Sequence, residues 1–75
     1  MDNKEVKYTI VREVAVLSEK TNGWSKQLNL ISWNEGEPKY DIRDWSPDRT
    51  KMGKGVTLTP AEMQSLSEAI ETLEL

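Results

Sequence analysis

Apolar and polar residues alternate in short runs along the first two-thirds of the chain, which predicts antiparallel β-strands. The first run covers residues 6–20 (VKYTIVREVAVLSEK) and is rich in β-branched residues. Its apolar side chains recur at the period of two that is typical of a strand: Tyr8, Ile10, Val14 and Val16. The following turn, at residues 21–23 (TNG), is predicted because Asn and Gly adopt positive φ at little cost.

Two further runs, at residues 24–33 (WSKQLNLISW) and 39–45 (KYDIRDW), predict the second and third strands. The turn between them contains Gly36, which we expect to provide its backbone freedom. Side chains in a strand point alternately to its two faces. In the second strand one face carries Leu28 and Leu30, and the other carries Gln27, Asn29, Ile31 and Trp33. In the third strand one face carries Tyr40 and Ile42, and the other carries Lys39, Asp41, Arg43 and Trp45.

The remainder of the chain predicts a loop at residues 46–55, a short strand at 56–58 and one helix. Thr59 can cap the helix, Pro60 sits where a missing N–H costs nothing, and Glu62 completes a capping box. An apolar stripe follows at helical spacing: Met63, Leu66, Ile70 and Leu73. The predicted fold is α+β, a four-stranded antiparallel meander followed by a C-terminal helix (ββββα).

The length of 75 residues indicates one domain, residues 1–75, with a small core. A domain of this size buries only about 60% of the surface of its extended chain. No cysteine is present to form disulfides. Oligomerisation can supply the missing core, so we expect a homodimer whose interface contains the apolar stripe of the helix.

Several function classes fit the sequence poorly. Histidine and cysteine are both absent, so we expect no cofactor and no metal site built on them. No nucleophile has an adjacent base, and Asp41 and Asp44 should point to opposite strand faces, so we expect neither an enzyme nor a small-molecule substrate. No apolar run approaches the roughly 20 residues of a membrane span. We expect a cytoplasmic protein, with nucleoid association as an option.

The net charge is −3, but the charges are unevenly distributed. Residues 56–75 hold four acids and no base, which leaves nine acids and ten bases in residues 1–55, a balance of +1. All the positive charge therefore lies outside the acidic C-terminal segment.

Cations and tryptophans recur on the predicted sheet in a pattern suited to single-stranded nucleic acid. Cations follow phosphates, and flat rings stack on bases for about 1–3 kcal/mol each. The candidate binding residues are Lys26, Trp33, Lys39, Arg43, Trp45, Lys51 and Lys54. The alternative is that the cations are simply solvated and the tryptophans fill a core. For Trp24 we favour packing.

The stretch YDIRDWSPDRTKMGKGVTLTPAEMQSL resembles the single-stranded-DNA-binding domain of the transcriptional positive cofactor four family, and is most similar to its bacterial YdbC-type branch. The resemblance implies a homodimer in which each subunit has a curved four-stranded sheet and the helices pair. Arg43, Trp45 and Lys54 match family residues that contact the strand, and Trp33 lies near a family aromatic. Lys26, Lys39 and Lys51 come from the charge pattern alone.

Two functions from different classes follow. The favoured one is sequence-independent binding of single-stranded DNA, or of RNA, by a homodimer, with a role in transcription, replication or repair. The alternative is a protein-interaction module that docks a partner through the acidic helix, with nucleic acid incidental.

Overall fold

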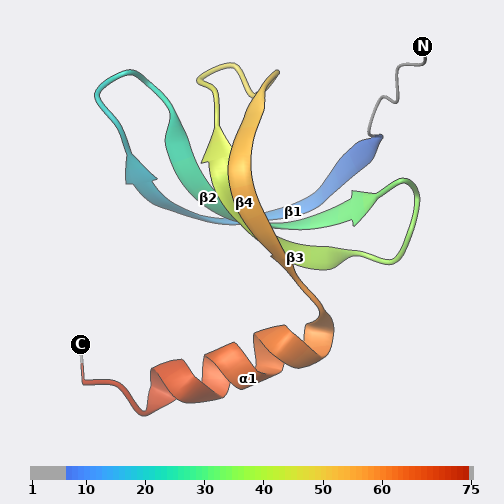
Figure 1. Ribbon diagram of the computed structural model, residues 1–75, viewed down its shortest axis with the longest axis vertical. Helices are drawn as coiled ribbons and strands as arrows, with labels where there is room; N and C mark the ends of the chain where they lie inside the picture. The colour runs from blue at the N-terminus through green and yellow to red at the C-terminus, as the bar shows by residue number, and fades with distance from the viewer. Residues whose placement is uncertain (1–6, 75) are drawn as a thin grey trace.

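The computed structural model describes residues 7–74, which form four strands and one helix (Figure 1). The elements are β1 (Tyr8–Glu19), β2 (Ser25–Trp33), β3 (Lys39–Trp45), β4 (Met52–Leu58) and α1 (Pro60–Glu71). The strands form one antiparallel sheet in the order β1-β2-β3-β4. The predicted ββββα fold is confirmed.

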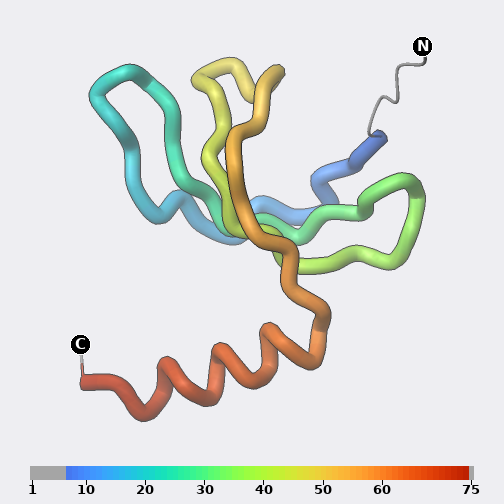
Figure 2. The backbone as a smooth tube through the Cα atoms, in the orientation of Figure 1, coloured from blue at the N-terminus to red at the C-terminus, as the bar shows by residue number. Residues whose placement is uncertain are grey.

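The sheet is strongly curved and opens away from α1 (Figures 1 and 2). Its edge strand β1 contains three irregularities in its pairing with β2, between Ile10 and Arg12, between Glu13 and Ala15, and between Val16 and Ser18. Such bulges bend a strand and increase its twist. The period of two that we predicted for β1 is therefore wrong in detail. Val14 lies in a bulge rather than on a regular face.

The concave face carries the core. On this face lie the alternate β2 and β3 residues that the sequence pattern assigned to one side: Gln27, Asn29, Ile31, Trp33, Lys39, Asp41, Arg43 and Trp45. Across the two strands, Gln27 pairs with Arg43, Asn29 with Asp41, and Ile31 with the exposed Lys39. The four largest side chains that are fully buried all lie on this face: Trp45, Ile31, Asn29 and Asp41. Two of these four side chains are polar, so the stability of the core depends on hydrogen bonding as well as on apolar contact.

The convex face is apolar and incompletely covered. Its residues include Leu28, Leu30, Tyr40, Ile42 and Leu58, all of which are half-buried. Helix α1 lies beneath this face and approaches it only near β3 and β4 (Figure 1).

Helix α1 begins as predicted but packs loosely. The Thr59 hydroxyl accepts a hydrogen bond from the Glu62 N–H, and the Glu62 carboxylate accepts one from the Thr59 N–H. No residue of α1 is buried. Ile70 keeps 46% of its surface exposed, and Leu73, which follows the helix end, keeps 56%. Among residues 7–74, no helix is both long and apolar enough to cross a membrane.

The turns depart from prediction in two places. Between β2 and β3, Asn34 (φ 51°) and Glu35 (φ 63°) adopt the left-handed conformation, rather than Gly36. Strand β4 begins at Met52, so Gly53 and Gly55 lie in a strand and not in the predicted loop. A Cβ on Gly55 would lie 2.1 Å from the Cβ of Arg43, which explains why β4 can approach β3 only with glycine there.

Candidate nucleic-acid interface

A buried ion pair organises the concave face. The Asp41 side chain is fully buried and accepts hydrogen bonds from Arg43 Nε (2.7 Å), Arg43 Nη2 (2.9 Å) and Thr57 Oγ1 (2.8 Å). Arg43 also donates to the Gly53 carbonyl (3.2 Å), and its guanidinium lies over the Trp33 ring at 5.1 Å. These contacts neutralise the charge of Arg43 and leave its side chain only 15% exposed. Arg43, a candidate phosphate ligand in the sequence analysis, therefore already binds the Asp41 carboxylate and the Gly53 carbonyl within the protein.

An aromatic cluster lies beside this ion pair in the trough that the concave face of the curved sheet forms. The cluster consists of Tyr8, Trp33 and Trp45. The Tyr8 ring lies 5.8 Å from Trp33 and 5.6 Å from Trp45 between centroids, tilted against both. Trp45 is fully buried. The expectation that its indole faces solvent is wrong, because curvature brings Tyr8 of the edge strand across the trough. Trp33 is half-buried as a residue, and its ring nitrogen Nε1 is buried.

Three of the candidate lysines have solvent-accessible positions. Lys39, Lys51 and Lys54 are exposed. Lys51 is held at the end of the β3–β4 loop, because its N–H donates to Ser46 Oγ and its carbonyl accepts from the Ser46 N–H, each at 3.0 Å. Lys54 belongs to the stretch of β4 where the register with β3 shifts.

Lys26 does not join this group. It pairs with Asp44 across β2 and β3, and both lie on the face opposite Gln27 and Arg43. Lys26, a candidate from the charge pattern, therefore does not share a face with Arg43 and Trp45. The sequence alone could have shown this, because Lys26 and Gln27 are neighbours in β2 and neighbouring side chains in a strand point to opposite faces.

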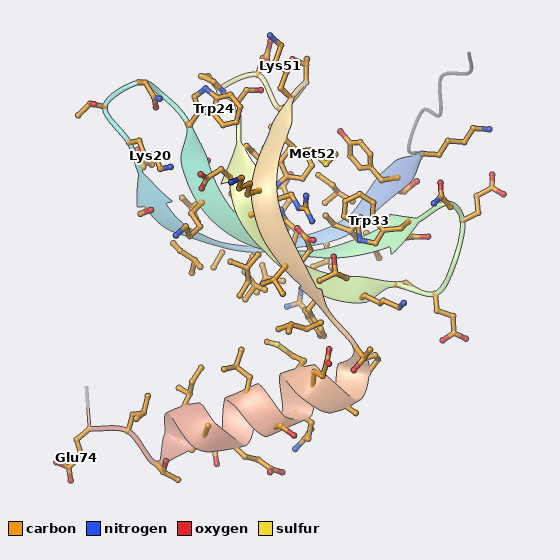
Figure 3. All side chains as sticks on the ribbon, viewed as in Figure 1. Lys20, Trp24, Trp33, Lys51, Met52 and Glu74 are labelled. Atoms are coloured by element: carbon orange, nitrogen blue, oxygen red, sulfur yellow. The ribbon has the colours of Figure 1, made fainter. Side chains whose placement is uncertain are left out.

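Lys20, which the sequence reasoning overlooked, and Trp24 lie near the β1–β2 hairpin end (Figure 3). Lys20 donates to Asp44 Oδ2 at 2.7 Å. Trp24 packs over Gly53, where a Cβ would lie 3.5 Å from its ring, in agreement with the packing role we favoured. Arg49 in the β3–β4 loop pairs with Glu13 of β1. The left-handed backbone of Arg49 (φ 64°) has no signal in the sequence.

Asp48 shapes the β3–β4 loop that presents Lys51. Its Oδ1 accepts hydrogen bonds from the Thr50 N–H (3.0 Å), the Thr50 hydroxyl (2.8 Å) and the Ser46 hydroxyl (2.9 Å). The backbone bond from Thr50, then the two hydroxyl bonds, lower the pKa of Asp48 from 3.8 to about 2. Bonds to the ionised carboxylate favour the charged form.

The fold is a small four-stranded antiparallel sheet module followed by one helix. Residues 20–69 match the family described as Transcriptional Coactivator p15 (PC4), so the chain belongs to this family, which binds single-stranded DNA. The chain is also 49% identical over 73 residues to an uncharacterized protein of Treponema pallidum (strain Nichols), which covers 97% of this chain and 86% of that protein. The family indicated by the sequence motif is confirmed.

The lowered pKa of Asp48 gives a pH-dependent prediction. Because its pKa is lower in the folded state, Asp48 stabilises the loop fully above pH 3.8, and this contribution disappears as the pH falls through about 2. The side-chain carboxyl resonance of Asp48, followed by NMR, should titrate with a midpoint of about 2. Thr50→Val removes one donor and should raise that midpoint. A midpoint of 3.8 or higher in the unmodified protein would contradict the loop geometry.

Proposed function

We propose that the chain binds single-stranded DNA as a homodimer, largely without regard to sequence, at the concave face of its sheet. The observation that carries this proposal is the half-buried Trp33 on the same sheet face as the exposed Lys39, in a chain of the PC4 family. The family description favours a role connected with transcription.

The exposed lysines bind the phosphates in this proposal. Within residues 7–74, no ion pair involves Lys39, Lys51 or Lys54, whereas Lys20, Arg43 and Arg49 each have a carboxylate partner. A lysine without an internal partner loses little when it binds a phosphate, and the displaced counterions favour association. Lys26 contributes only at long range, because it lies on the other face.

Trp33 stacks on a base, and its neighbours hold it in place. The Arg43 guanidinium lies over the Trp33 ring, and Tyr8 connects Trp33 to the buried Trp45. Arg43 and Trp45 therefore support the stacking ring instead of forming the main contacts with DNA. A ring held in this way loses little conformational entropy on binding.

The proposal also accounts for the loosely packed helix. Among residues 7–74 of a single chain, Ile31 and Trp45 are the only buried apolar residues. The convex face and the stripe of α1 remain partly open, with Val56 50% and Ile70 46% exposed. A second copy is the occupant we propose for this face, since its own helix and convex face offer the same apolar surface in a self-complementary arrangement.

Tryptophan fluorescence during titration with oligo(dT) tests DNA binding. We expect quenching that is largely lost in Trp33→Phe, weak binding of duplex, and a log–log salt slope of about −0.7 per phosphate contact. Lys51→Ala and Lys54→Ala should each weaken binding severalfold and reduce the slope by about that amount. Lys26→Ala is the matched control on the opposite face and should change affinity less than about twofold. A flat salt response would contradict the proposal.

Sedimentation equilibrium tests the dimer. The unmodified protein should sediment as a dimer at micromolar concentration, and Ile70→Glu should shift it towards monomer, because a carboxylate would be buried in the apolar interface. Ser65→Glu adds the same charge to α1 away from the stripe and should leave the dimer intact. A folded monomer of the unmodified protein would refute the interface.

A further inference from the structure

The β1 side of the trough contains a cleft that the proposed function does not use. Its volume is about 240 Å³, below the range of about 300–1,000 Å³ typical of drug-sized ligands. It is lined by residues 13–16 of β1, by Gln27 and Asn29 of β2, and by Arg49 of the β3–β4 loop. Its size suits a single nucleobase better than a larger molecule.

The floor of the cleft consists of two buried amides. Gln27 is 4% exposed and Asn29 is 1% exposed. Asn29 Nδ2 donates to Gln27 Oε1 at 3.2 Å, and Gln27 Nε2 donates to Ser25 Oγ at 2.8 Å. Each amide NH₂ carries two hydrogens, and these bonds use one of each. The remaining donors, together with the amide oxygens, match the mixed donors and acceptors on the edge of a base.

An ion pair closes one side of the cleft. Arg49 Nη1 donates to Glu13 Oε2, and this pair joins the β3–β4 loop to β1 across 36 positions of sequence. The Arg49 side chain is 34% exposed and that of Glu13 is 61% exposed. Exposed pairs of this kind contribute about 0–1 kcal/mol, so Arg49 can exchange its partner at little cost. A phosphate presents the guanidinium with the same kind of anionic oxygen as the carboxylate does.

Building on the proposed DNA binding, we propose that this cleft binds one nucleotide of the single strand. The base edge contacts the amides of Gln27 and Asn29, and the phosphate replaces Glu13 as the partner of Arg49. Glu13 is then an internal competitor that lowers the affinity for DNA. Arg49 becomes a phosphate ligand in this arrangement.

Charge removal at Glu13 tests the exchange. Glu13→Gln keeps the side-chain shape and should tighten oligo(dT) binding by about three- to tenfold, because Arg49 no longer has a competing anion. Glu19→Gln, the same charge change further along β1, should change affinity less than about twofold. Arg49→Gln should weaken binding, and Glu13→Gln should have no further effect in that background. Equal effects of the two glutamate variants, or an undiminished effect without Arg49, would overturn the proposal.

NMR tests the base contact without disturbing the core. The side-chain amide resonances of Gln27 and Asn29 should shift with oligo(dT) and stay unchanged with an abasic oligonucleotide of equal length. The Arg49 Nε–H resonance should shift with both. Oligo(dT) binding that leaves the two amides unshifted would overturn the nucleotide site alone, whereas no binding of oligo(dT) at all would overturn the proposed function itself.

Discussion

The structure depends on the buried pair between Asp41 and Arg43. A carboxylate without exposed surface is tolerated only when its oxygens are paired and hydrogen-bonded, and Asp41 meets this requirement with Arg43 and with Thr57 of β4. Arg43 extends the network to the Gly53 carbonyl and the Trp33 ring. One carboxylate thus fixes β3 against β4 and sets the position of the aromatic ring to which we assign base stacking.

This polar core explains how a single sheet can serve two purposes. Because hydrogen bonds and aromatic rings fill the concave face, that face can present Lys39 and the half-buried Trp33 to a ligand. The apolar convex face and the stripe of α1 remain for association with a second chain. The small number of apolar residues buried within residues 7–74 is consistent with the dimer that we propose.

Short sequence patterns correctly predicted those features that depend on residues close together in the chain. The bounds of β3, the two faces of β2 and the cap formed by Thr59 and Glu62 agree with the expectations. Alternation assigns a residue to a face but does not say how deeply that face is buried. The burial of Trp45 follows from the bulges of β1 and from Tyr8, which is distant in sequence. The Glu13–Arg49 pair likewise joins distant segments through a left-handed residue, so no local pattern could reveal it.

The most direct test of this account is the free energy of unfolding of Asp41→Asn, measured by urea denaturation. The substitution keeps the side-chain shape but leaves the charge of Arg43 without its anionic partner, so the account predicts a loss of about 3 kcal/mol or more. Asp44→Asn, which breaks the more exposed pair with Lys20 on the opposite face, should cost about 1 kcal/mol or less. Equal, small losses for the two variants would contradict the claim that the Asp41–Arg43 pair holds the concave face together.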